Sequence, residues 1–193
     1  ALPSIAEIFQ RYEREKRKRG LVDFDDLIAR CAQLLHEDPE FAKVQQWRFR
    51  HLFVDEFQDV TPAQLHLVKG WFSRDDLCVV GDPDQAIYGF AGADPSALTD
   101  FGREFPEAST VRLGLNYRST PEIVTAARAV LPRRDRADVR AAGAEGPPPT
   151  VSSYPSDTAE AAGVAATLRR EHGPDRPWGE MAVLYRVNAQ SAA

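Results

Sequence analysis

Two short apolar runs in this sequence each lead into a group of acidic and amide side chains. The first run, residues 52–54, stops at Asp55 and Glu56, and the second, residues 77–80, is followed closely by Gln85. A carboxylate at a strand end can hold Mg²⁺, usually through water, because this small hard ion favours oxygen ligands and keeps much of its hydration shell. A second carboxylate can orient or deprotonate a water that attacks the γ-phosphate of a nucleotide. Asp55 and Glu56 are the candidates for these two roles, with a loop that is merely acidic as the alternative.

Gln85 and two aromatic residues after the second apolar run are further candidates for ligand contacts. Gln85 is expected beside the first loop in space, where its amide can sense a γ-phosphate and report its loss. Tyr88 and Phe90 follow at once, and aromatic rings are platforms on which bases stack, worth about 1–3 kcal/mol per base. The alternative is that both rings are tucked into the core.

A third candidate group lies further along, at Tyr117 and Arg118. Arginine is a permanent, planar cation, which suits the charge that develops during phosphoryl transfer. A structural ion pair is the alternative for Arg118. Tyr117 can stack on an adenine or simply pack.

The elements around the first two groups predict how they are positioned. Apolar runs of this length, bounded by turn residues, are typical of strands buried on both faces of a parallel sheet. Between them, Thr61, Pro62 and Gln64 predict a helix start with Thr as N-cap, Pro in the first turn and Gln three residues after the cap. Strand, helix and strand form a βαβ unit. Its acids lie outside the carboxyl ends of the strands, where open α/β sheets bind their ligands.

The N-terminal part of the chain predicts two helices. Residues 5–19 form a charged helix ended by Gly20, with favourable i,i+4 pairs from Glu13 to Arg17 and from Glu15 to Arg19. Its basic end is either a DNA-facing patch or a solvated helix face. Asp23 caps a second helix, and its apolar positions are expected to pack on a sheet. These positions are Phe24, Leu27, Ile28, Cys31, Leu34 and Leu35.

Strands alternating with helices throughout argue for an α/β fold. The remaining elements are predicted by apolar runs, helix starts and Pro or Gly clusters. Further helices are expected near residues 40–47, 96–105, 120–131 and 157–170, strands near 110–115, 151–154 and 181–185, and a linker-like loop over 132–150.

Composition limits the classes to which the protein can belong. The 193 residues are 43% hydrophobic and carry a net charge of −5, so the chain has enough apolar residues for a core and no overall basic field for nucleic acid. Two lone cysteines favour a reducing cytoplasm over a disulfide scaffold. The absence of a signal peptide or a long apolar span argues against a membrane location. The excess of Arg over Lys and the many alanines hint at a GC-rich bacterial genome.

The candidate groups together resemble a known family. Residues 54–59, 79–88 and 116–120 look like the second, third and fourth helicase motifs of the UvrD/PcrA/Rep group of superfamily one. Residues 21–28 resemble the segment before these motifs, and residues 182–191 resemble a strand and loop of the second motor domain. The resemblance covers nearly the whole chain in the right order.

The resemblance implies an ATP-driven DNA translocase with 3′-to-5′ polarity and a RecA-like parallel sheet with flanking helices. It implies that Asp55 binds Mg²⁺, that Glu56 activates water and that Gln85 couples to the γ-phosphate. Tyr117 then stacks on the adenine of ATP, and Arg118 contacts its phosphates.

On the DNA side, the resemblance implies that Tyr88 and Phe90 touch single-stranded DNA, with duplex junctions as a further partner. Family members often carry Trp at the position of Phe90 and Arg at Gly89 and Ala91, so stacking and a local ion pair are expected to be weaker here.

The phosphate-binding motif Gly-x-x-x-x-Gly-Lys-Ser/Thr does not occur in these residues. The expectation is therefore an internal piece of a helicase that is inactive alone. Residues 1–20 are the end of a helical insertion, 21–115 the back of the first RecA-like domain, and 116–193 the start of the second. Repair or recombination is the expected setting. The alternatives are the motor segment of a helicase–nuclease for double-strand breaks and a catalytically dead RecA-like interaction module.

Overall fold

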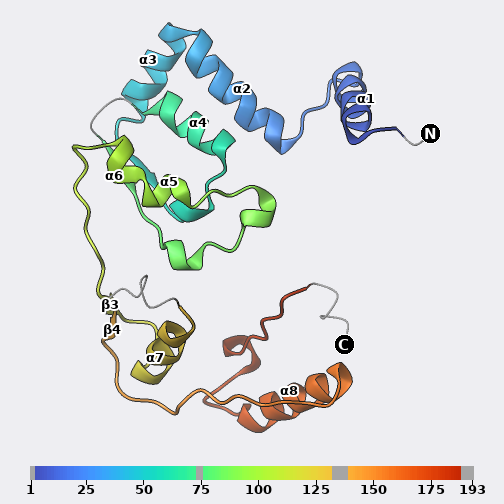
Figure 1. Cartoon of the computed structure of the whole chain (residues 1–193), viewed down its shortest axis with the longest axis vertical. Coiled ribbons are helices and arrows are strands. Elements are labelled where there is room, and N and C mark those ends of the chain that lie inside the picture. The colour runs from blue at the N-terminus through green and yellow to red at the C-terminus, as the bar shows by residue number, and fades with distance from the viewer. Residues whose placement is uncertain (1–2, 73–75, 132–138, 188–193) are drawn as a thin grey trace. The chain divides into compact units, whose positions relative to one another are not determined.

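The computed structural model describes residues 3–72, 76–131 and 139–187. The chain divides into two compact units, which meet in the sequence between Leu113 and Gly114. Each unit has its own helices and its own pair of parallel strands (Figure 1). The predicted mixed α/β class is confirmed.

The end of α1 and the start of α2 lie where the sequence predicted them. Helix α1 (Ile5–Lys18) ends at Gly20, whose φ of +64° and N–H bond to Arg17 complete a Schellman-type stop, together with the Leu21 N–H bond to Lys16. Helix α2 (Phe24–Glu37) begins with a capping box in which Asp23 and Asp26 exchange side-chain and backbone hydrogen bonds. Helix α3 (Pro39–Arg48) follows after Asp38, which caps it.

A cluster of charges around Lys16 ties α1 to the start of α2. Lys16 is only 7% exposed, and its Nζ lies 2.6 Å from Glu13, 2.9 Å from Asp23 and 2.8 Å from Asp26. Burial by itself lowers the pKa of Lys16, but the hydrogen bonds to these carboxylates outweigh it and raise that pKa above its usual range. A hydrogen bond from Tyr12, and then the one from Lys16, hold the pKa of Asp23 far below its ordinary value.

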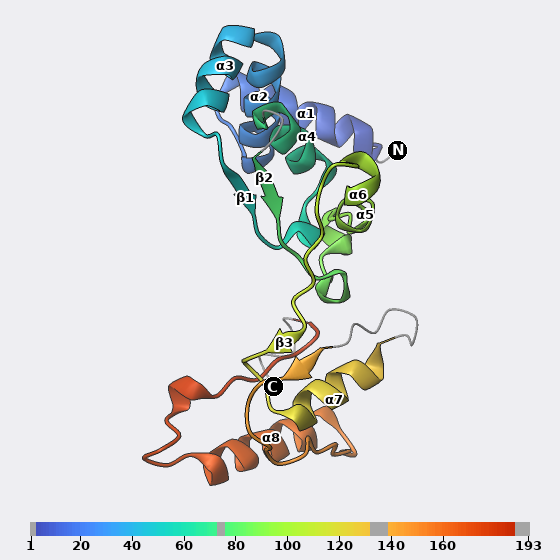
Figure 2. The same cartoon turned by 90° about the vertical axis from the view of Figure 1, so that its left-hand side faces the viewer.

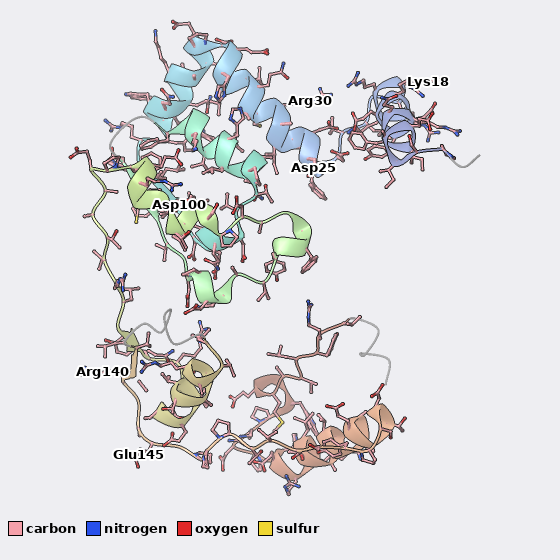
Figure 3. All side chains as sticks on the ribbon, in the orientation of Figure 1. Lys18, Asp25, Arg30, Asp100, Arg140 and Glu145 are labelled. Atoms are coloured by element: carbon pink, nitrogen blue, oxygen red, sulfur yellow. The ribbon has the colours of Figure 1, made fainter. Side chains whose placement is uncertain are left out.

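The basic end of α1 is therefore largely compensated by acids. Arg17 reaches Glu13 at 4.0 Å and Arg19 reaches Glu15 at 3.7 Å, as the i,i+4 spacing predicted. Other side chains point outward on all sides of this helix, including Lys18, and α1 stands apart from α3 (Figure 3). The solvated-face interpretation fits these contacts better than a basic patch.

The prediction that α2 packs on a sheet is wrong. Helix α2 lies instead on α4 (Pro62–Trp71) and α3, and it buries Ala32 and Leu35. The close approach to α4 depends on Gly70, where a Cβ would meet Leu35 and His36 at 3.2 Å. Most of the predicted stripe is exposed in this unit, since Phe24 is 86% accessible to solvent.

The central βαβ unit is confirmed. Strand β1 (Leu52–Val54) pairs in parallel with β2 (Leu77–Val79), and α4 connects them, with Thr61 and Gln64 forming its capping box (Figure 2). The expectation of strands buried on both faces is wrong. Phe53 is 76% exposed and Cys78 is also exposed, because only one face of this two-stranded sheet is covered.

Aromatic rings form the core beside the sheet. Phe57 is 1% exposed and meets Phe101 edge-on at 5.8 Å. Phe105 lies tilted against Phe101 and meets Phe72 edge-on. The helix predicted over residues 96–105 is two short helices, α5 (Ser96–Thr99) and α6 (Phe101–Glu104), separated at Asp100.

The second unit follows the predicted helices better than the predicted strands. Helices α7 (Pro121–Val130) and α8 (Asp157–Glu171) lie where they were expected. The predicted strand at 110–115 shrinks to β3 (Leu115–Asn116), which pairs in parallel with β4 (Arg140–Ala141). The strands predicted at 151–154 and 181–185 are wrong, since both segments form neither helix nor strand in the described chain. Residues 132–138 of the predicted loop and 188–191 of the last matching segment lie outside the described residues.

Within the described ranges, three short 3-10 turns follow β1 and β2, and one more follows α8. They are η1 (Phe57–Asp59), η2 (Pro83–Gln85), η3 (Gly89–Ala91) and η5 (Trp178–Glu180). Within the ranges that the structure covers, the chain has no helix with the length and apolar character needed to cross a membrane.

Candidate functional site

The two acids at the end of β1 are exposed and share a tight backbone turn. The Glu56 N–H donates to Asp55 Oδ1 at 2.9 Å, which fixes the direction of the Asp55 carboxylate. Glu56 itself has φ 52° and ψ 42°, the left-handed conformation that a residue with a side chain adopts only at a cost. It is the only non-glycine residue with positive φ in the described chain. This turn leaves both carboxylates exposed at the end of the strand, while the next residue, Phe57, is buried in the core.

Beneath these acids lies Gln58, which is 1% exposed. Its Nε2 donates to Glu56 Oε2 at 2.7 Å, and its Oε1 accepts the N–H of Asp82 at 3.0 Å. The loop after β1 is therefore joined to the loop after β2 by one buried amide. Backbone bonds from Phe57 to Val80 and from Val80 to Val54 reinforce the join.

Gln85 is joined to this network through Asp82. The Gln85 Nε2 donates to Asp82 Oδ2 at 2.7 Å, while Asp82 Oδ1 accepts the N–H of Asp84. Both Gln85 and Glu56 are exposed, whereas Asp82 is half-buried. The structure thus brings Asp55, Glu56 and Gln85 to one edge of the β1–β2 sheet, as the βαβ pattern predicted.

Tyr88 and Phe90 form an exposed aromatic pair just after η2. Their ring centroids are 6.0 Å apart, and the residues are 47% and 79% exposed. The alternative that both rings fill the core does not hold. Rings presented in this way can stack on flat ligands such as bases.

Tyr117 and Arg118 belong to the second unit, in the loop that follows β3. Asn116 shapes this loop, because its Oδ1 accepts the N–H groups of Arg118 at 3.0 Å and Ser119 at 2.8 Å. Tyr117 is 80% exposed, and Arg118 is exposed as well. The first unit alone carries Asp55, Glu56 and Gln85, so the structure groups Tyr117 and Arg118 separately from them.

The residues at the end of β1 fit a hydrated Mg²⁺ ion held with a nucleotide. Mg²⁺ commonly takes one or two carboxylates and completes its shell with water and phosphate oxygens. Asp55 offers one exposed, oriented carboxylate of this kind. Across the described residues, no group of three or more His, Cys, Asp or Glu side chains is arranged to enclose a metal without such help.

Sequence reasoning missed the role of Gln58 and the requirement for Gly81. A Cβ at Gly81 would lie 2.6 Å from Gln58 Oε1 and 2.9 Å from Leu98 Cδ2, so only glycine leaves room for the buried amide. The available signals were an amide two residues after the second acid and a glycine directly after the second strand. Neither predicts a contact across two loops.

Comparison with known proteins gives a consistent result. The family described as "UvrD/REP helicase N-terminal domain" matches residues 2–106. That range contains β1, α4 and β2 and both strand-end loops, so the match includes the site built from Asp55, Glu56 and Gln85.

Similar full-length proteins come from several bacteria. The chain is 44% identical to ATP-dependent DNA helicase UvrD2 of Mycobacterium bovis, over 97% of this chain and 28% of that protein. It is 36% identical to ATP-dependent DNA helicase PcrA of Staphylococcus epidermidis, over 97% of this chain and 26% of that protein. The putative ATP-dependent DNA helicase YjcD of Bacillus subtilis is 35% identical, over 98% of this chain and 25% of that protein. The chain thus spans about a quarter of the length of these relatives.

Proposed function

Because this chain belongs to the UvrD/REP helicase family, we propose that it forms part of an ATP-dependent DNA helicase that moves 3′-to-5′ along single-stranded DNA. Its named relatives are ATP-dependent DNA helicases, which supports the assignment. Bacterial DNA repair or recombination is the setting that we propose, with duplex junctions as the second DNA partner.

The observation that carries the proposal is the acidic end of β1. Asp55 and Glu56 leave the strand side by side, and Glu56 is tied by a buried amide to the loop that holds Gln85. Adjacent carboxylates with different partners can take different roles, and phosphoryl transfer needs one group for the metal and one for water.

In this proposal, Asp55 holds Mg²⁺ and Glu56 orients and deprotonates the attacking water. Bound Mg²⁺ neutralises charge that develops on the phosphate oxygens. Gln85 contacts the γ-phosphate region and reports its loss to the rest of the protein. Tyr117 stacks on adenine, and Arg118 adds fixed positive charge near the phosphates.

The exposed pair Tyr88 and Phe90 provides the DNA contact. Stacking is tolerant of sequence, because every base has a flat face, and this suits a protein that must step along a strand. The rings follow Gln85 by a few residues in one loop region, so a change at Gln85 can reach them over a short path.

We further propose that residues 21–115 are the back of the first motor domain and residues 116–193 the start of the second, with 1–20 ending a helical insertion. The division of the chain at Leu113 and Gly114 supports this assignment.

The test is Glu56→Gln in the full-length protein. The amide keeps the size of the side chain but cannot take a proton. We expect kcat for DNA-stimulated ATP hydrolysis to fall by at least about 100-fold, the usual minimum for losing a general base. The dissociation constant of a fluorescent ATP analogue should stay within about twofold, and unchanged turnover would remove Glu56 from this role.

A further inference from the structure

Gln58 uses both ends of its side-chain amide to join two loops. It is 1% exposed, donates to Glu56 Oε2 at 2.7 Å and accepts from the Asp82 N–H at 3.0 Å. Other orientations of this buried amide are disfavoured, because leaving either end without a hydrogen bond costs about 1–3 kcal/mol.

The chemistry of its partners fixes the orientation of this amide. A backbone N–H can only donate, so the end of Gln58 that faces Asp82 must be the oxygen. The nitrogen then faces Glu56, and a carboxylate accepts that bond readily. The donor therefore reaches the Glu56 carboxylate from the protein interior.

Glu56 needs such a partner because its side chain is exposed to solvent. The residue is exposed, and its left-handed backbone places it on a turn rather than on the regular strand. A catalytic side chain works best when neighbouring groups lock its rotamer within a few tenths of an ångström. In the described chain, the hydrogen bond from Gln58 orients the Glu56 carboxylate.

Gly81 gives independent support for a built site. Its position directly after β2 leaves space for Gln58 Oε1, which a Cβ would approach to 2.6 Å. The φ of Gly81 is not in the left-handed region, so its lack of a side chain serves this close approach rather than backbone conformation. The second loop is thus shaped around the amide of the first.

We propose that Gln58 is the positioning residue for Glu56. It holds the carboxylate toward the attacking water and keeps it in register with the loop of Asp82 and Gln85. This inference rests on the proposed role of Glu56 in ATP hydrolysis. Outer partners of this kind typically change activity about 10- to 100-fold when removed.

The first test compares Gln58→Met and Gln58→Glu in the full-length protein. Methionine keeps the volume and removes both hydrogen bonds, while glutamate keeps an acceptor for Asp82 but loses the donor to Glu56. Both variants should lower kcat by about 10- to 100-fold. The KM for ATP and the affinity for a fluorescent ATP analogue should change less than about threefold, because Gln58 has no proposed contact with nucleotide.

The matched control is Gln33→Met on α2. Gln33 also donates its amide to a carboxylate, that of Glu37, at 3.0 Å, but this pair is exposed and belongs to helix α2 rather than to either strand-end loop. Its kcat should equal that of the unmodified protein. A purely structural role for Gln58 predicts instead that nucleotide affinity and thermal stability fall together with kcat, and that result would overturn the proposal.

Gly81→Ala provides a second route that leaves Gln58 in place. The added methyl group displaces Oε1, so kcat should fall while Gln58 and Glu56 are both still present. Gly102→Ala is its control, because nothing lies within 4 Å of the added Cβ there. If Gly81→Ala keeps full kcat, Gln58 does not need its observed position, and the inference fails.

Glu56→Gln separates the two possible failures. If Glu56→Gln leaves turnover unchanged, the proposed function of Glu56 fails and the inference falls with it. If Glu56→Gln stops turnover but both Gln58 variants keep normal kcat, only the positioning role is wrong. In the supported case, Glu56→Gln combined with Gln58→Met is no slower than Glu56→Gln alone, because the two residues act as one unit.

Discussion

The loops after β1 and β3 are built on the same local plan and are held in different ways. In each, a short parallel strand ends in polar residues, and a Thr-Pro pair then starts a helix, at Thr61 before α4 and at Thr120 before α7. In the first loop, Phe57 is buried and Gln58 ties the loop to its neighbour. In the second loop, the aromatic residue Tyr117 is 80% exposed.

The helix starts differ as well. Thr61 Oγ1 accepts the N–H of Gln64 at 3.3 Å, and the Thr61 N–H donates to Gln64 Oε1 at 2.9 Å, whereas Thr120 makes no such cap bond. The start of α7 is tied elsewhere, because the Glu122 carboxylate accepts the N–H of Gly146 at 2.9 Å. The first loop is thus held by the buried side chains of Phe57 and Gln58. The second loop is held by the hydrogen bonds of Asn116 and by the bond between Glu122 and Gly146. Their residues have correspondingly different proposed tasks, since water activation needs a fixed geometry while a stacking ring needs access.

The largest expected difference between the loops concerns their aromatic residues. Phe57→Ala should cost about 3–5 kcal/mol, because it removes a buried ring that meets Phe101. Tyr117→Ala should change stability by less than about 0.5 kcal/mol, as exposed positions usually do. Hydrogen exchange of amides in β1–β2 and in α7 of the full-length protein measures both. Equal losses of stability in Phe57→Ala and Tyr117→Ala would contradict this expected difference between the loops.

The second difference should appear with pH. The pKa values of Asp23 and Glu122 are lowered from their ordinary values of 3.8 and 4.5. Both carboxylates therefore stabilise the folded chain at a pH above these ordinary values, and this stabilisation is lost as the pH falls below them. The raised pKa of Lys16 adds a contribution that is complete below 10.5 and declines above it. Acid should therefore loosen both units, and alkali should loosen the Lys16 cluster in the first.

Urea unfolding, followed by circular dichroism, tests this expectation with two variants. Above pH 10.5, the free energy of unfolding should decrease less in Lys16→Met than in the unmodified protein, because the variant lacks the titrating group of the cluster. Glu122→Gln should show the same decrease as the unmodified protein. An identical alkaline response in the unmodified protein and in Lys16→Met would show that the cluster does not stabilise the join between α1 and α2.

The smallest difference concerns the two threonines. Thr61→Ala should cost about 1 kcal/mol, because it removes an N-cap hydrogen bond, whereas Thr120→Ala removes no such bond. Exchange of the Gln64 amide should accelerate in Thr61→Ala, and the corresponding Ile123 amide should be unaffected in Thr120→Ala. Similar acceleration at both helix starts would mean that Thr120 caps α7 after all.

Much of the fold was accessible from local signals. Capping residues predicted the starts of α2 and α4, because a cap depends on a few neighbouring residues. The parallel pairing of β1 and β2 followed from apolar runs joined by a helix. The strands expected at 151–154 and 181–185 failed, because extended, apolar sequence becomes a strand only when another strand lies beside it. The prediction that the apolar face of α2 packs on a sheet was wrong for a similar reason, since periodicity predicts an apolar face but not the element that covers it.

For the candidate site, residue types and their distances from the strand ends were enough to identify the side chains and the chemistry they can perform. Asp55, Glu56 and Gln85 could be named because residue type and distance from a strand end are local properties. The contacts that hold these groups in place became visible only in the folded chain. The buried amide of Gln58 and the space at Gly81 both depend on two loops meeting, and a contact between residues 24 positions apart leaves no mark in either stretch of sequence.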